Sequence, residues 1–449
     1  MLDLGENRET LPRLTSARPL VLFISLFPLW WLLGFGVLGF HVLGLIMAIQ
    51  LWRRGSISTP AGFGFMLAFL VWFGLSITVI YEDAPFAQEE RGLAHIVPFL
   101  FNLSWFMLLA IVVLYIGNLR EEELSSALVL RLFSTMFLVT VAGGYLGMLF
   151  PYADFPSAFE LILPGSLANQ DFIRVLMHIS FAEIQDFLGF TTARPRAPFN
   201  YTNTWGGTLG VTLPFFVVHW SDRSRPRLRK LLPVVLVVAA VPVVVSLNRG
   251  LWLGLALMGA FWVLRSVLRG HLRVAVAAGV VAAVGIAALS VGPAASLVNA
   301  RLSADQSSNA GRTELASYSL RSVFTGSPLL GFGTTRTLTG SFHGINGART
   351  EDCRLCAPPQ MGTQGVFWYL LYAHGALGLL LFIGFVATRL FRALPDDDPV
   401  AVAWVAAAAF IGLTSLIYDL LNAPLFFFFV GLGLVWRHQR SAENSGVPA

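Results

Sequence analysis

The sequence predicts an all-α integral membrane protein with about twelve transmembrane helices and two long outer loops. Of its 449 residues, 56% are hydrophobic and only 12% are charged, which is the composition of a polytopic membrane protein. The formal net charge of +5 could suggest a nucleic-acid partner. However, the basic residues gather in short loops between apolar runs, and membrane topology explains that pattern better than nucleic-acid binding.

Apolar runs long enough to cross a bilayer, about 17 residues or more, define the predicted spans. We place them at 19–35, 36–52, 60–81, 95–117, 124–149, 204–220, 231–247, 250–268, 272–291, 365–388, 399–417 and 422–436. The sequence is therefore divided into an N-terminal tail (1–18), a transmembrane domain (19–436) and a C-terminal tail (437–449). No cleavable signal peptide is evident, so the first span is expected to be retained.

The distribution of arginine predicts the orientation of these spans. With the N-terminus in the cytoplasm, the inner loops and the C-terminal tail hold most of the basic side chains. These are Arg53, Arg54, Arg120, Arg223, Arg225, Arg227, Arg229, Lys230, Arg265, Arg269, Arg273, Arg389, Arg392, Arg437 and Arg440. The short outer loops hold almost none beyond Arg91 and Arg249, as the positive-inside rule requires. Both tails are then cytoplasmic, and the two long connections, 150–203 and 292–364, lie outside.

The long outer loops are where functional groups are expected, because a rigid scaffold holds them. In the first loop, Phe172, Val175, Leu176 and Ile179 have helical spacing and predict a helix over 171–188. Charged residues interrupt it, so we expect it to lie in the interface or against the bundle. In the second loop, we expect a helix from Arg312 to Phe324, ended by Gly326 and Pro328, and irregular backbone at 331–333 and 340–347.

Arg249 lies in a polar step, Ser246–Gly250, between the apolar runs 231–245 and 251–264. A charge within a membrane costs several kcal/mol, roughly 2.5–3.5 at a helix centre, unless a partner or water satisfies it. Arg249 could simply extend to the outer headgroups. However, Arg312 recurs at the start of the predicted helix in the neighbouring loop. Two outward arginines can clamp a diphosphate through charge-assisted hydrogen bonds.

Several short motifs carry a family resemblance. Residues 246–254, Ser-Leu-Asn-Arg-Gly-Leu-Trp-Leu-Gly, resemble the S-x-S-R-G-x-x-L-G signature of the O-antigen ligase and O-antigen polymerase family, with Asn248 at the second serine. Gly311-Arg312 and residues 327–333, Ser-Pro-Leu-Leu-Gly-Phe-Gly, resemble that family's G-R and P-L-x-G-x-G segment. Residues 375–378, Gly-Ala-Leu-Gly, fit its later G-x-x-G. The resemblance covers about residues 195–435.

This resemblance implies a GT-C-type ligase/polymerase fold in the bacterial cytoplasmic (inner) membrane, with the active site on the outer face. It implies that a glycan passes from an outward-facing polyprenyl-diphosphate carrier to an acceptor hydroxyl on a glycan or lipid. No metal or cofactor is expected, and membrane lipids rather than nucleic acid surround the site. Arg249 and Arg312 would bind the diphosphate, while Asn203 and Asn248 would be further substrate contacts.

The acceptor side differs from the family pattern. The ligases carry a histidine where this chain has Gln364, and an amide cannot serve as a general base. Either Gln364 only orients the acceptor, or the base is elsewhere, or the chemistry is not ligation. His343 and Asp419 are the candidate bases; the alternative for each is an ordinary solvated loop residue. His374, followed by Gly375 in the middle of a span, is expected to pack against a neighbouring helix.

Cys353 and Cys356 have the spacing of a zinc-ligand pair, but the chain has no second pair of cysteines to complete four ligands. On the outer face, a local disulfide is the expected state. We therefore predict no metal site.

Two alternatives from other functional classes stay open. A transporter or flippase for a lipid-linked glycan would share the bundle and the anion-binding arginines. It should also show polar groups along a path between the two faces, for which Arg131 is one of few candidates. A non-catalytic protein that binds the glycan lipid is the other, and the glutamine at position 364 is compatible with it.

Overall fold

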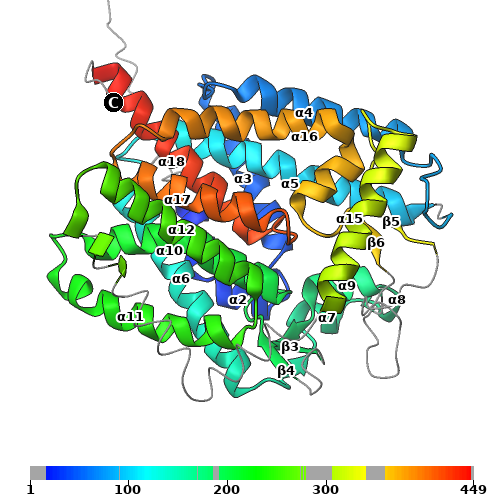
Figure 1. The fold of residues 1–449 in the computed structure, drawn as a ribbon, viewed down its shortest axis with the longest axis horizontal. Coiled ribbons are helices and arrows are strands. Elements are labelled where there is room, and N and C mark those ends of the chain that lie inside the picture. Colours follow the sequence, from blue (N-terminus) through cyan, green and yellow to red (C-terminus); the bar gives the residue numbers. More distant parts are fainter. Residues whose placement is uncertain are drawn as a thin grey trace, which may run out of the picture.

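The computed structural model describes residues 17–89, 92–168, 170–185, 192–273, 275–276, 278–279, 306–339 and 359–445. The described chain is mostly helical (Figure 1). Among the described residues, five helices are long and apolar enough to cross a membrane: α5 (Leu93–Asn118), α6 (Ser126–Leu149), α11 (Pro226–Val245), α12 (Arg249–Leu268) and α16 (Val366–Ala393). The membrane character of the chain is thus supported, while the number of twelve spans stays a prediction.

The other predicted spans contain shorter, broken or less apolar helices. These are α1 (Arg18–Ser25), α2 (Phe27–Leu32), α3 (Leu38–Arg54), α4 (Phe63–Leu75) with the 3-10 turn η1 (Ser76–Val79), α10 (Thr202–Ser221), α17 (Pro399–Thr414) and α18 (Ala423–Ser445). The first span is broken at Leu26, where Pro28 follows and supplies no N–H group to continue the hydrogen-bond ladder. The predicted span at 272–291 lies almost entirely outside the described residues.

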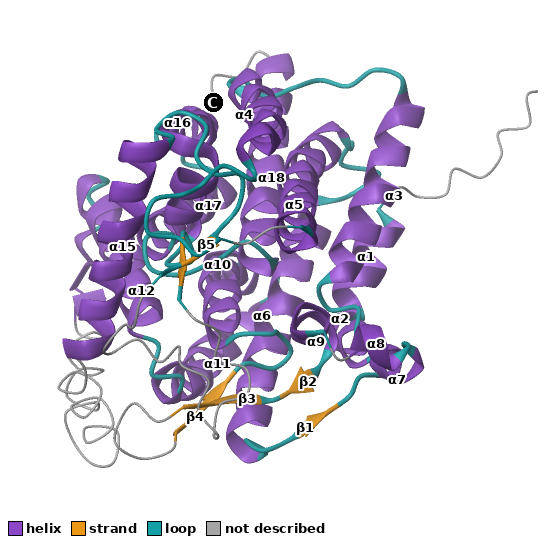
Figure 2. Ribbon diagram, turned by 90° about the vertical axis from the view of Figure 1, so that its right-hand side faces the viewer, coloured by secondary structure: helices purple, strands orange, loops and turns teal. Residues whose placement is uncertain are grey.

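The connection before α10 forms one end of the bundle, here called the loop-rich end. It contains α7 (Ala158–Ile162), α8 (Gly165–Ala168), α9 (Asp171–Met177), and four strands: β1 (Asp154–Phe155), β2 (Ile179–Ser180), β3 (Ala182–Gln185) and β4 (Thr192–Pro195). β1 pairs with β2, and β3 with β4, both antiparallel. Figure 2 shows these elements at one end and the chain's C-terminal end at the other.

The prediction of a helix over 171–188 is confirmed from Asp171 to Met177 and was wrong from His178 to Gln185; residues 186–188 lie outside the described residues. α9 ends at Met177, because His178 is held between the carboxylates of Glu160, at 3.0 Å, and Asp154, at 2.6 Å. The next residues form β2, which pairs with β1, and β3, which pairs with β4 in a hairpin, and this strand pairing overrides the local helical spacing. The described fold is therefore helical with small antiparallel sheets rather than purely all-α.

The second long connection contains α15 (Gln306–Gly326), β5 (Arg336–Thr337) and β6 (Gln360–Met361), and β5 pairs with β6. The predicted helix from Arg312 is confirmed, although α15 begins earlier, at Gln306. It ends at Gly326, two residues before Pro328, as the sequence indicated.

The Gly331–Gly333 turn lies against a kink in α16. Gly375, inside α16, has a φ of 68° and interrupts the helical hydrogen bonding there. The backbone N–H groups of Phe332 and Gly333 donate to the carbonyls of Tyr372 and Ala373, at 3.0 and 2.8 Å. Gly331 and Gly333 both have positive φ, which glycine adopts without a steric penalty. Two of the family-like motifs are therefore packed against each other, and the turn satisfies carbonyls that the kink frees.

His374 is completely buried beside the same kink. Its ring lies 3.7 Å from the ring of Phe73, centroid to centroid, and its Nδ1 is 2.8 Å from Ser76 Oγ. The expectation that His374 packs against a neighbouring helix is confirmed.

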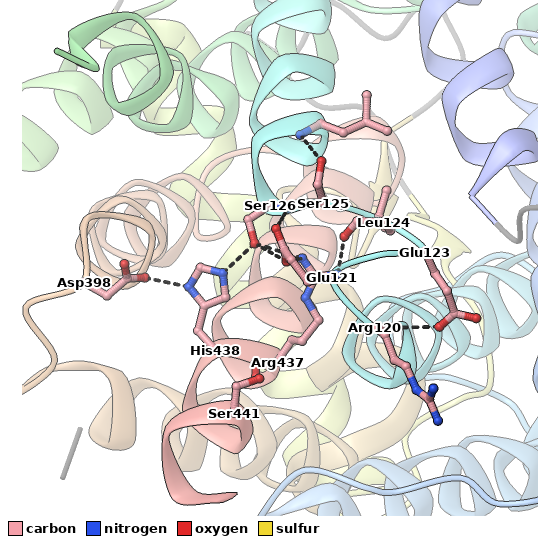
Figure 3. A network of polar contacts seen from close by, with 11 residues as sticks. Arg120, Glu121, Glu123, Leu124, Ser125, Ser126, Asp398, Arg437, His438 and Ser441 are labelled. Carbon is pink, nitrogen blue, oxygen red and sulfur yellow. Dashed lines mark hydrogen bonds and ion pairs between the residues drawn. The ribbon is translucent and has the colours of Figure 1, made fainter. Parts of the chain in front are cut away.

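The arginines of the predicted inner loops meet at the end of the bundle opposite to β1–β4, here called the arginine-rich end. Arg437, on α18, pairs with Glu121 at 3.1 Å and donates to the carbonyl of Leu124 at 2.6 Å. His438 contacts Asp398 at 3.0 Å and Ser126 at 2.8 Å, so it links the starts of α17 and α6 (Figure 3). Three of the segments that were predicted to lie inside, the turn before α6, the start of α17 and the end of α18, are therefore close together, and Glu121 pairs with Arg437 there.

Candidate substrate-binding site

The polar step before α12 is a tight turn. α11 ends at Val245, and Leu247 has a φ of 50°, a left-handed conformation that is costly for a side chain with a γ-branch. The side-chain oxygen of Asn248 then accepts the N–H of Leu251 at 2.9 Å and caps α12. Arg249, half-buried, is the first residue of that helix. Strained backbone of this kind is concentrated at functional sites.

The β3–β4 hairpin fixes this turn from outside the bundle. Arg194, on β4, donates from Nε to the carbonyl of Ser246 at 2.9 Å and lies 3.6 Å from the carboxylate of Glu183 on β3. Glu183 also accepts the N–H of Thr202, the first residue of α10, at 2.8 Å. One buried arginine and its carboxylate partner thus connect the starts of α10 and α12.

Two of the predicted substrate contacts lie side by side. The amide nitrogen of Asn248 donates to the amide oxygen of Asn203 at 3.2 Å. Asn203 lies in the first turn of α10, and Asn248 caps α12, so the pair brings the two helix starts together.

Tyr418, in the connection between α17 and α18, contacts both the start of α12 and Arg312. Its hydroxyl accepts the N–H of Gly250, the residue after Arg249, at 3.1 Å. The guanidinium carbon of Arg312 lies 5.3 Å from the centre of its ring, and Arg312 Nη1 donates to the carbonyl of Ile417 at 3.2 Å. Arg312 and the backbone that directly follows Arg249, more than sixty positions apart in sequence, therefore both contact Tyr418.

Gly250 has no room for a side chain at this contact. A Cβ there would lie 2.2 Å from Cε2 of Tyr418, well inside van der Waals distance. The glycine that follows the arginine therefore allows the start of α12 to approach the tyrosine ring closely.

The start of α16 reaches the same connection. The N–H groups of Val366 and Phe367 donate to the carbonyls of Tyr418 and Ser415, at 3.2 and 3.1 Å. A Cβ on Gly365 would lie 2.2 Å from the Ser415 oxygen, so this approach also requires glycine. We call residues 415–419 the tyrosine turn.

Gln364 lies next to the tyrosine turn but is buried. Its Nε2 donates to Ser319 Oγ, on α15, at 3.1 Å, whereas its Oε1 has no hydrogen-bond partner in the described structure. Its exposed fraction is 8%. Gln364 therefore links the start of α16 to α15 and retains one unused acceptor.

Asp419 ends the tyrosine turn. Its carboxyl group is accessible to solvent, yet the surrounding protein limits its hydration and raises its pKa, while the N–H of Leu421 donates to it at 3.0 Å and lowers the pKa to a smaller extent. The pKa of Tyr201 is raised to about 12, chiefly by burial and then by the negative charges of Glu183 and Asp419. Asp419 and Tyr201 therefore lie close enough to interact electrostatically.

The arrangement favours binding of an anion. The N-terminus of a helix carries a partial positive charge, and the starts of α12 and α16 both donate an N–H group to Tyr418. The start of α10 is joined to them through Asn203 and Asn248. Arg312 adds a full positive charge beside Tyr418, and Arg249 is the first residue of α12.

Two candidates lie outside the described residues: His343, and the cysteine pair Cys353 and Cys356. Within the part of the chain that the structure describes, no group of three or more His, Cys, Asp or Glu side chains could hold a metal ion.

The sequence did not identify Tyr418, Ser319 or the Arg194–Glu183 pair. The signal that could have identified Tyr418 is the Arg249-Gly250 step, since a glycine after a charged residue at a helix start often indicates a close approach by another group.

A comparison of the chain with protein-family models and with curated proteins returned no match.

Proposed function

We propose that this protein transfers a glycan from a polyprenyl-diphosphate carrier to an acceptor hydroxyl, in ligation or polymerisation of a cell-envelope polysaccharide. The observation that carries the proposal is that Arg312 and the start of α12, where Arg249 is the first residue, both contact Tyr418, next to the start of α16. The motif resemblance points to the same donor. The proposed site faces the outside of the bacterial inner membrane.

The two arginines act on the leaving group. Guanidinium groups bind phosphate oxygens in bidentate fashion. Arg312 contacts a ring face and a carbonyl, and within the described residues no carboxylate pairs with it. When the bond between sugar and phosphate breaks, the polyprenyl diphosphate gains negative charge. The clamp therefore stabilises the transition state more than the bound substrate.

We assign Asp419 as the general base for the acceptor hydroxyl. It takes the proton of the acceptor hydroxyl as the oxygen bonds to the sugar carbon, and the diphosphate leaves with the electrons of the broken bond. Its raised pKa makes it a better base than an ordinary aspartate, and its carboxyl group is accessible. Gln364 is buried and does not titrate, so its role is to hold α15 and to offer Oε1 as a hydrogen-bond acceptor.

The test is a transfer assay with purified protein, carrier-linked glycan and acceptor, read by mass spectrometry. We expect Arg249→Ala and Arg312→Ala each to lower the rate about 10²–10³-fold, the usual cost of losing one group that stabilises developing charge. Arg321→Ala is the matched control, because Arg321 is exposed on the same helix as Arg312, nine residues on, and has no ion pair in the described structure. Normal transfer by Arg249→Ala or Arg312→Ala would contradict the proposal that the two arginines clamp the diphosphate.

Envelope glycans from cells with and without the chain separate ligation from polymerisation. Accumulated carrier-linked glycan together with loss of the finished conjugate supports ligation. Retained single repeat units support polymerisation.

A non-catalytic binder of the glycan lipid is the second candidate, and the buried glutamine at position 364 favours it. Gln364→His separates the two functions, since a gain of transfer from an inactive parent would show that the chemistry had been lost. A transporter has weaker support, because Arg131 lies on the exposed surface of α6 rather than on a path through the bundle. Movement of labelled carrier between the leaflets of vesicles without glycan transfer would favour it.

A further inference from the structure

The turn between α10 and α11 contains a basic hollow that the proposed reaction does not use. It has a volume of about 330 Å³ and is lined by Arg223, Pro226, Arg229 and Lys230. Pro226, Arg229 and Lys230 occupy one face of α11, since residues three and four apart are neighbours on a helix. Arg223 approaches from the preceding turn.

The charges of this hollow are not neutralised. Within the described chain, Arg223, Arg229 and Lys230 form neither an ion pair nor a side-chain hydrogen bond, and all three are exposed. The adjacent Arg225 differs, because it lies 3.7 Å from Asp222 and donates to His219 at 2.9 Å. A concentrated positive charge without carboxylate partners attracts anions.

The rest of α11 presents an apolar surface. Ala239 and Pro242 are its buried residues, and Figure 1 shows the helix at the periphery of the bundle. Its most exposed apolar side chains follow Lys230 at helical spacing: Leu231, Val234, Val237 and Val241. An apolar stripe therefore begins where the basic hollow ends.

We propose that the hollow binds the phosphate of an anionic phospholipid whose acyl chains lie along this stripe of α11. Arg223 and Arg229 supply planar donor pairs for the phosphate oxygens, and Lys230 supplies a further charge. The free N–H groups in the first turn of α11 add a partial positive charge. Basic pockets at the cytoplasmic ends of membrane helices bind lipid headgroups by this chemistry.

The test is native mass spectrometry of the purified full-length chain, titrated with phosphatidylglycerol. Arg229→Ala and, independently, Lys230→Ala are each expected to weaken binding about fivefold, from the usual contribution of one basic residue at an anionic membrane surface. Arg227→Ala is the control, because it removes the same charge from the same helix turn but does not line the hollow. We expect it to bind as the parent does.

Two further titrations use phosphatidylcholine and an excess of inorganic phosphate. We expect the zwitterionic lipid to bind more weakly and the phosphate not to displace phosphatidylglycerol, because it lacks acyl chains. If Arg227→Ala lost as much affinity for phosphatidylglycerol as Arg229→Ala and Lys230→Ala, the attraction would come from the general positive charge and not from the hollow. If phosphatidylcholine bound as tightly as phosphatidylglycerol, the site would not recognise the lipid's negative charge. Displacement by inorganic phosphate would identify a site for soluble anions. Each of these results would overturn the proposal.

Discussion

Glu123 and Asp419 lie at opposite ends of the bundle, and their pKa values are shifted in opposite directions. Burial alone would raise the pKa of Glu123, but Arg54 Nη2, at 2.6 Å, and the N–H of Arg120, at 2.8 Å, outweigh it and lower the pKa. Asp419 accepts the N–H of Leu421, but the surrounding protein limits its hydration and raises its pKa. The first carboxylate is stabilised as an anion by its partners, while the second is destabilised as an anion.

The arginines differ in the same way. At the arginine-rich end, Arg437 and Arg265 pair with the carboxylates of Glu121 and Asp397, at 3.1 and 3.0 Å. At the tyrosine turn, Arg312 contacts a ring face and a carbonyl. The ion pairs at the arginine-rich end connect helices to one another, whereas we propose that Arg312 at the tyrosine turn binds a ligand.

The largest effect expected from this difference is on activity. Asp419→Asn removes the proposed base and should lower the rate of glycan transfer about 10²–10⁴-fold, the usual contribution of a general base. The parent rate should fall as the pH decreases through a pKa above the ordinary aspartate value of 3.8. The rate of the variant should not show this decrease at low pH. Glu123→Gln, a matched loss of one negative charge at the other end, should leave the rate unchanged. An unaltered pH profile in Asp419→Asn would exclude Asp419 as the base.

The close approach of Gly250 to Tyr418 predicts a loss of stability. Gly250→Ala forces Cβ into the ring and should cost about 1–3 kcal/mol by overpacking, measured as a lower Tm in detergent. Gly259→Ala is the control in the same helix, because a Cβ there meets nothing within 4 Å. We expect it to be neutral or stabilising by up to about 1 kcal/mol, since alanine favours helix more than glycine does. Equal Tm values for the two variants would show that the Tyr418 ring moves aside at little cost in free energy.

Asp419 should also lower stability at neutral pH. Its folded-state pKa is above that of the unfolded chain, so its contribution to stability is full below pH 3.8 and is lost as the pH rises through the raised pKa. Asp419→Asn should therefore have a higher Tm than the parent at pH 7, and the difference should disappear at low pH. A lower Tm at pH 7 would mean that the ionised carboxylate has a stabilising partner.

Glu123 should show the smallest effect and the opposite pH dependence. Its folded-state pKa is lowered, so its stabilising contribution is present above the unfolded value of 4.5 and is lost as the pH falls through the lowered pKa. Glu123→Gln should cost about 0.2–1 kcal/mol at pH 7, as expected for a partly exposed ion pair. The cost should vanish in acid, and a cost that persisted there would have a source other than the Arg54 pair.

The helices were predictable because a long apolar run has few alternatives in a membrane. The strands β3 and β4 were not, because their stability comes from a pairing across residues 182–195 that helical spacing does not reveal. The arginines of the site were predictable from local motifs. Tyr418 was not, since its role depends on how α12, α15 and α16 pack around it. Gln364 could be identified by its position in the motif, but only the fold shows that it is buried against Ser319.

The most direct test of the central claim is the affinity of the purified protein for a polyprenyl diphosphate without a glycan. We predict that Arg312→Ala weakens binding about 10–100-fold, because a hydrogen bond to a charged group contributes about 1.5–3 kcal/mol. Arg321→Ala, on the same helix, should bind as the parent does. An Arg312→Ala variant with the parent's affinity would contradict the assignment of the tyrosine turn as the diphosphate site.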